Sequence, residues 1–227
     1  MDHDPNAPPL NPLPWIVWAL ALPLIAVEVV AQLNAAGLMG EPHANWRGMA
    51  VQLFGFSPDY LRRSLETGDW PADAVWRLGS YVLVQLDVAA ALFAVVLTLA
   101  LGKMVGEAFR WWAVALIFIG SAVVAAFVYT LVLPGNRAGL VGAFPAVYGL
   151  IGGFTFLIWV RQVATGGSQL RAFALIGFLM GVQLFFGLFT GGLMWVAELA
   201  GFCTGFLLSF VVAPGGMRRV MGRLRRR

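Results

Sequence analysis

The sequence has little charge, almost no cysteine and only two histidines. Charged residues make up 11% of the 227 residues, which is too few to cover a water-soluble globule of this size. The single cysteine, Cys203, excludes a disulfide framework, and we expect it to be an inert packing residue within an apolar helix. The histidines, His3 and His43, lie outside the apolar runs and form no metal-binding motif, so the sequence predicts no metal site and no cofactor.

The chain is instead rich in long hydrophobic runs. Hydrophobic residues make up 60% of the sequence. A membrane-spanning helix needs about 20 apolar residues. Six runs approach this length: 15–33, 87–101, 111–132, 141–160, 170–188 and 194–212. They use almost the whole chain, so we expect an all-α membrane protein in which residues 15–213 form one six-transmembrane-helix bundle without a separate soluble domain.

Basic residues indicate the orientation of this bundle. The tail 214–227 carries six arginines, and the loops on the same side hold Lys103, Arg110, Arg161 and Arg171. An excess of Lys and Arg favours the cytoplasmic side. We therefore expect both termini, including the proline-rich segment 1–14, in the cytoplasm of a multi-pass protein of the bacterial inner membrane type. An alternative role for the arginines of the tail is contact with anionic lipid headgroups. Nucleic-acid binding is not expected.

The connection 34–76 is the only long external loop, and a loop of this length usually has structure or function of its own. Ser57, Pro58 and Asp59 form a helix-start pattern, with Leu61 and Leu65 four residues apart after it. We expect a short amphipathic helix at the membrane interface, where the aromatic residues of the loop are favourable.

Four motifs occur in order along the chain. Trp76-Arg77 ends the long loop, Ser80-Tyr81 follows it, residues 142–150 read G-A-F-P-A-V-Y-G-L, and residues 197–205 read A-E-L-A-G-F-C-T-G. Together they resemble the rhomboid intramembrane serine proteases, over about residues 34–210. In that family the fourth membrane helix begins with a G-x-S-G motif and the sixth carries a histidine before a small-xxx-small repeat. The resemblance implies a six-helix rhomboid-like fold.

The resemblance places other residues at the positions of the catalytic dyad. Phe144 stands where the family has its serine, and Glu198 stands where it has its histidine. Pro145 replaces a glycine beside the nucleophile, and proline lacks a backbone N–H. Acyl transfer needs a nucleophile and a base within hydrogen-bond reach. The sequence therefore predicts no catalytic residues in the usual sense.

The positions that help to stabilise the oxyanion are replaced as well. Ala90 and Ala94 stand where the family has a histidine and an asparagine, and neither can donate a side-chain hydrogen bond. Gln85 takes the place of an earlier histidine. We expect Glu198 to lie near Phe144, Tyr148 and Gln85 as a hydrogen-bonded clamp or as part of a binding site. The structural residues carried over by the resemblance are Trp76, Arg77, Gly142, Gly149, Gly201 and Gly205.

The preferred interpretation is a pseudoprotease that binds transmembrane segments of client membrane proteins within the lipid bilayer. One alternative is an active rhomboid-type intramembrane serine endopeptidase with a non-standard site, for which Ser80 and Thr204 are the nearest hydroxyls. Another is a proton-coupled carrier that uses Glu198. We expect Asp87 to cap the second helix and Glu28 to reach water at the external end of the first.

Overall fold

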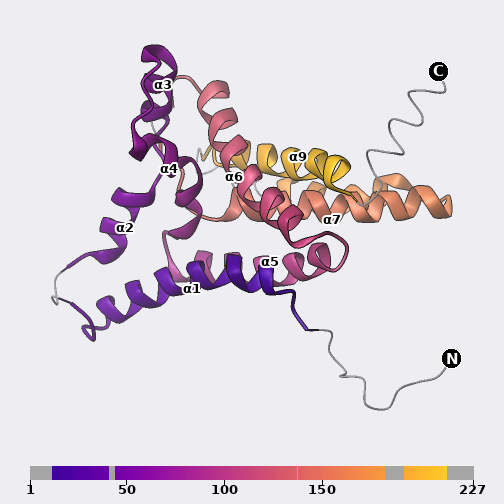
Figure 1. The fold of residues 1–227 in the computed structure, drawn as a ribbon, viewed down its shortest axis with the longest axis horizontal. Helices are drawn as coiled ribbons and strands as arrows, with labels where there is room; N and C mark the ends of the chain where they lie inside the picture. Colours follow the sequence, from indigo (N-terminus) through magenta and orange to yellow (C-terminus); the bar gives the residue numbers. More distant parts are fainter. Residues whose placement is uncertain (1–11, 41–43, 137, 182–191, 214–227) are drawn as a thin grey trace.

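The computed structural model describes residues 12–40, 44–136, 138–181 and 192–213, and the structure there is almost entirely helical (Figure 1). Five helices are long and apolar enough to cross a membrane: α1 (Trp15–Ala35), α5 (Val88–Gly106), α6 (Trp111–Val132), α7 (Phe144–Thr165) and α9 (Trp195–Val212). The predicted all-α membrane bundle is confirmed.

The predicted span 170–188 is described only in part. A shorter apolar helix occupies Gln169–Gly181 and begins with the 3₁₀ turn η2 (Gln169–Phe173). Residues 182–188 of this prediction lie outside the described residues.

Several helix boundaries differ from the expected runs, and two of the differences have a local cause. Helix α5 continues five residues past Leu101, because Lys103 is tolerated in its last turn, where a cation is favourable near the helix C-terminus. Helix α7 begins at Phe144, because Gly142 has a φ of 116°, which no helical residue adopts. Asp87 caps α5 as expected, with its carboxylate accepting a hydrogen bond from the Ala90 N–H at 2.8 Å.

Helix α7 lies at the centre of the bundle and α1 at its edge. In the most apolar window of each helix, 61% of the α7 residues are buried, against 22% for α1. Helix α7 packs against α5, α6 and α9, and α1 packs mainly against α5. The pairing of α7 with α9 along their length is visible in Figure 1.

Glycines bring α7 and α9 into backbone contact. A Cβ added at Gly205 would lie 2.6 Å from the Gly149 carbonyl carbon, and one at Gly201 would lie 2.9 Å from that of Pro145. On the facing helix, a Cβ at Gly152 would lie 2.6 Å from the Phe206 nitrogen. Close backbone approach maximises van der Waals contact, which drives helix association in lipid.

Cys203 is exposed on α9, so the expectation that it packs inside the bundle is wrong. The buried face of α9 carries Gly201, Gly205 and Ser209, which are spaced by four residues. At about 100° per residue, Cys203 lies on the opposite side of the helix, midway between the two glycines.

The connection between α1 and α5, which includes the predicted loop 34–76, folds into three helices and one 3₁₀ turn: α2 (Trp46–Phe54), α3 (Pro58–Thr67), α4 (Ala72–Ser80) and η1 (Tyr81–Leu83). The helix expected after Ser57 is confirmed as α3, although the Ser57 side chain makes no capping hydrogen bond. Leu61 is buried and Leu65 is 47% exposed, so the two leucines do not share a buried face.

Hydrogen bonds attach this connection to the bundle. Phe56 and Leu140 form an isolated antiparallel bridge, with N–H to carbonyl distances of 3.0 and 2.9 Å. The Arg62 guanidinium donates to the carbonyls of Leu133 and Asn136, which follow α6. The buried Tyr81 hydroxyl donates to the Ala122 carbonyl of α6 at 2.9 Å. The connection is therefore a fixed part of the fold.

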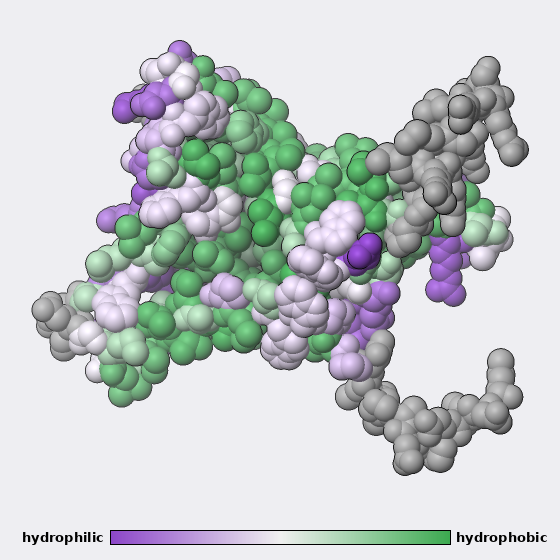
Figure 2. Space-filling model, viewed as in Figure 1, coloured by the Kyte–Doolittle hydropathy of each residue, from purple (hydrophilic) through white to green (hydrophobic). Residues whose placement is uncertain are grey.

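The surface is apolar over the helices and polar at the ends of the molecule. Figure 2 shows hydrophobic residues over most of the visible face, with hydrophilic residues over α3 and near the C-terminal end of α7. A wide apolar band between two polar regions is the pattern of a protein that crosses a bilayer.

Candidate functional site

The candidate site begins at the N-terminus of α7. Phe144 is the first residue of this helix and is partly buried against the core, and Pro145 follows it in the first turn. Proline fits there because the first N–H groups of a helix have no partner within it. The Gly142 N–H donates to the Tyr81 carbonyl at 3.0 Å, which fixes the chain just before the helix.

A carboxylate and a phenol meet between α7 and α9. Glu198 lies in the first turn of α9 and is only 3% exposed, and Tyr148 lies one turn into α7 and is 4% exposed. Their side chains lie close enough to interact electrostatically. A buried carboxyl in a membrane bundle is costly without a partner. The structure therefore brings together two of the residues predicted for this site.

Gln85 connects the end of η1 to the start of α7. Its carboxamide is buried, with Nε2 donating to the Val82 carbonyl at 2.9 Å and Oε1 accepting from the Ala143 N–H at 3.4 Å. A Cβ added at Gly142 would come within 3.2 Å of the same oxygen. Gln85 thus occupies the space beside the first backbone N–H groups at this end of α7.

The α5 side of the site presents methyl groups. Ala94 is completely buried and Ala90 is partly buried on α5, which packs against α7. The Ala90 N–H is used by the Asp87 cap. Neither side chain carries a hydrogen-bond donor.

The two members of the Trp76-Arg77 motif lie in different surroundings. The Arg77 guanidinium donates to the Gly55 carbonyl at 3.1 Å and lies 5.3 Å from the centre of the Tyr60 ring. Trp76 is 54% exposed. Arg77 therefore connects α4 to the α2–α3 turn, while Trp76 faces outward.

An ion pair that the sequence did not predict lies beside this site. Glu28 of α1 accepts two hydrogen bonds from Arg47 of α2, at 2.7 and 3.0 Å. Arg47 also donates to the Gln85 carbonyl at 2.6 Å. The Glu28 side chain, which was expected to reach water, is 15% exposed and is paired with Arg47. An acid in the outer half of a span, facing an arginine-bearing loop, is the signal that could have identified the pair.

The hydroxyls of Ser80 and Thr204 both donate to backbone carbonyls. The Ser80 hydroxyl donates to the Phe54 carbonyl at 3.1 Å, and the Thr204 hydroxyl donates to the Ala200 carbonyl at 2.7 Å. Within residues 12–40, 44–136, 138–181 and 192–213, no three His, Cys, Asp or Glu side chains are grouped so that they could hold a metal ion.

Comparison with known proteins identifies the fold. No curated protein matches the chain. The family model for the rhomboid domain matches residues 72–215, a segment that contains α4, α5, α6, α7 and α9. Because this match covers more than half of the chain, the protein belongs to the rhomboid family.

Proposed function

We propose that this rhomboid-family membrane protein is a pseudoprotease that binds transmembrane segments of client membrane proteins. The observation that carries the proposal is the composition of the site at the start of α7. Phe144 and Pro145 begin the helix, Glu198 interacts with Tyr148, and Gln85 lies against the Ala143 N–H. None of these positions carries a serine, threonine or cysteine beside a base.

The oxyanion positions support the same proposal. Ala90 and Ala94 carry no donor, and removal of one oxyanion donor typically lowers the rate of acyl transfer by about 10²–10³. Here the nucleophile, the base and the side-chain donors are replaced together. The remaining role of the scaffold is to present helix surfaces to other helices in the bilayer.

A serine peptidase with a non-standard nucleophile is less well supported. The hydroxyls of Ser80 and Thr204 donate to backbone carbonyls, and Thr204 bonds the carbonyl four residues earlier in its own helix. A proton-coupled carrier is the second candidate, and the buried Glu198 carboxyl is what favours it. Proton uptake into liposomes that carry the protein, compared with Glu198→Gln, tests this candidate.

Labelling with a serine-directed fluorophosphonate tests the pseudoprotease proposal. We expect no labelling of the purified protein and no cleavage of helical rhomboid substrates. Phe144→Ser should not restore either, because Pro145, Ala90 and Ala94 remain. Labelling that a single Ser or Thr substitution abolishes would instead identify an unusual enzyme.

The exposed faces of α5 and of the Gln169–Gly181 helix are the surfaces that we propose for client binding. Leu92 and Val96 of α5 are 63% and 50% exposed, and Phe178 is 69% exposed. Phe185, a further aromatic residue of the run 170–188, lies outside the described residues. Van der Waals fit selects partners in lipid, so large exposed side chains at these positions would set the specificity.

Site-specific photo-crosslinking tests client binding. Crosslinkers at Leu92, Val96 and Phe178 should capture other membrane proteins in native membranes. Ile119 of α6 is a matched control because its side chain is 52% exposed. Val123 of the same helix is less suitable as a control, because it packs partly against the core. Equal capture at Ile119 would contradict a dedicated client surface.

The orientation remains a proposal, with both termini in the cytoplasm. Reporter fusions at the C-terminus and near Ser57 should report opposite sides of the membrane, because an excess of basic residues flanks the helices on the side of the termini. The same side for both would show that the number of spans is wrong.

A further inference from the structure

One arginine connects three separate parts of the chain. From the start of α2, the Arg47 guanidinium donates to both oxygens of the Glu28 carboxylate on α1, at 2.7 and 3.0 Å. It also donates to the Gln85 carbonyl, between η1 and α5, at 2.6 Å. A guanidinium presents several N–H donors in one fixed plane, so a single side chain can satisfy two acceptors at once. Arg47 therefore joins α1 and α2 to the segment that leads into α5.

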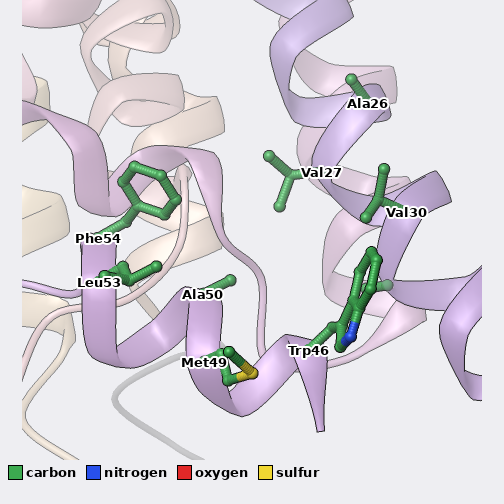
Figure 3. Close-up of a pocket in the computed structure, with 9 residues that line it drawn as sticks. Ala26, Val27, Val30, Trp46, Met49, Ala50, Leu53 and Phe54 are labelled. Carbon is green, nitrogen blue, oxygen red and sulfur yellow. The ribbon is translucent and has the colours of Figure 1, made fainter. Parts of the chain in front are cut away.

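Contacts at one end attach α2 to α1. Figure 3 shows Trp46 beside Val30, while a gap separates Val27 from Phe54. This gap is an apolar groove, and no residue of α2 is buried. The Trp46 backbone N–H donates to the Asn34 carboxamide oxygen at 3.4 Å, next to the ion pair. The position of α2 beside α1 therefore depends largely on the contacts that its first two residues make.

Gln85 lies outside any helix, in the segment 84–87 between η1 and α5. Two hydrogen bonds connect it to other elements: its carbonyl accepts from Arg47, and its carboxamide oxygen accepts from the Ala143 N–H. A third bond, from Nε2 to the Val82 carbonyl, is local to its own part of the chain. The position of Gln85 therefore depends on Arg47 as much as on its own side chain.

The Ala143 N–H needs the partner that Gln85 supplies. Ala143 is the N-cap of α7 and is completely buried. The first N–H groups of a helix have no acceptor within it, and a buried N–H without an acceptor is costly. The Gln85 carboxamide fits closely against the turn before α7, because a Cβ added at Gly142 would lie 3.2 Å from its Oε1. A shift of Gln85 would therefore leave the Ala143 N–H to be satisfied by water.

We infer that Arg47 is a positioning residue for the start of α7, and that it acts through Gln85. The guanidinium, held by Glu28, fixes the Gln85 backbone, and the Gln85 carboxamide in turn covers the Ala143 N–H. Helices α1 and α2 lie outside the segment that matches the rhomboid domain, so a contact outside that segment controls the access of water to the candidate site inside it. The inference does not rest on client binding, because it concerns the conformation of the site and not what the site binds.

Hydrogen–deuterium exchange of the whole protein in nanodiscs, read by mass spectrometry, tests the inference with Arg47→Lys. Lysine keeps a cation beside Glu28, so the unfolding midpoint should stay close to that of the parent protein. It presents its donors from one nitrogen on a shorter side chain, so it cannot reproduce the bridge to Gln85. We expect the peptide that contains Ala143 to exchange about tenfold faster, which is the size of effect for a lost hydrogen bond to a charged group. The peptide that contains Gly152 should exchange at an unchanged rate.

Two further variants establish the order of the contacts. Gln85→Ala should raise exchange at Ala143 by itself, and Arg47→Lys should add little in that background, because both changes interrupt the same route. Asp59→Ala is the matched control, because it breaks an exposed ion pair of the external connection, and it should leave exchange at Ala143 unchanged. The inference would be overturned by unchanged exchange in Arg47→Lys, by an equal rise in the Gly152 peptide, or by additive effects of the Arg47 and Gln85 substitutions.

Discussion

Helices α7 and α9 meet through glycines, whereas α1 and α2 meet through charge. Gly149 lies against Gly205 so closely that a Cβ on the latter would overlap the backbone of the former. At the other end of the molecule, Glu28 and Arg47 bridge two helices that leave a groove between them. The backbones of α7 and α9 leave no space between them, whereas α1 and α2 leave an apolar groove.

This difference follows the boundary of the rhomboid domain. The α7–α9 contact lies within residues 72–215, and the α1–α2 contact lies outside them. Backbone packing between α7 and α9 therefore belongs to the part of the chain that matches the rhomboid domain. The first 71 residues, which include α1, α2 and the Glu28–Arg47 ion pair, lie outside the matched segment.

The largest effect should come from Gly205→Leu. The added side chain has no space against the Gly149 backbone, so we expect a loss of about 3 kcal/mol in the free energy of unfolding. Gly177→Leu is the matched control, because no atom lies within 4 Å of a Cβ added there. Unfolding midpoints in detergent should differ clearly between the two variants, and similar midpoints would show that α7 and α9 are not tightly packed.

The second-largest effect should come from breaking the ion pair between α1 and α2. Arg47→Ala leaves Glu28 without its cation in a partly buried place, so we expect a loss of about 2 kcal/mol, below the range for fully buried pairs. Asp59→Ala breaks the ion pair with Arg62, in which Asp59 is 58% exposed, and should cost no more than about 0.5 kcal/mol. Equal losses for the two variants would show that the α1–α2 ion pair stabilises the fold no more than an exposed ion pair does.

The sequence predicts those parts of the fold that depend on local pattern. Hydrophobic runs predict the spans, and Asp87 predicts the start of α5, because each depends on neighbours along the chain. The side of α9 that Cys203 occupies was not predicted, since it depends on which stripe of small residues faces α7. The spacing of Gly201 and Gly205 indicates which face of α9 packs against α7. The apolar residues around Cys203 do not indicate it.

The candidate site was predictable only where the family resemblance supplied the geometry. Glu198 and Tyr148 are 50 positions apart in sequence, and only the resemblance indicated that α7 and α9 would bring them together. The Glu28–Arg47 pair lies outside the matched segment, so hydropathy and charge counts left Glu28 facing water. Long-range polar contacts of this kind depend on the path of the external connection, which the sequence pattern leaves open.

The third effect concerns the contact between Glu198 and Tyr148, which lies between α7 and α9. Glu198→Leu should lose about 0.6–2 kcal/mol, the range for polar contacts between membrane helices, and Glu198→Gln should keep most of the stability. Tyr148→Phe should lose a similar amount, and the double variant Tyr148→Phe with Glu198→Leu should lose less than the sum. Additive losses would show that the two side chains stabilise the bundle independently.

The smallest effects should separate the two residues of the Trp76-Arg77 motif. Arg77→Ala removes the hydrogen bond to the Gly55 carbonyl and the contact with the Tyr60 ring, so we expect a loss of about 1 kcal/mol. Trp76→Ala removes an outward-facing side chain and should change the free energy of unfolding by about 0.5 kcal/mol or less. Both variants are compared by their unfolding midpoints in the same detergent. A larger loss for Trp76→Ala would mean that the exposed indole is buried against lipid or a partner, and that the external connection is held by its surroundings as much as by Arg77.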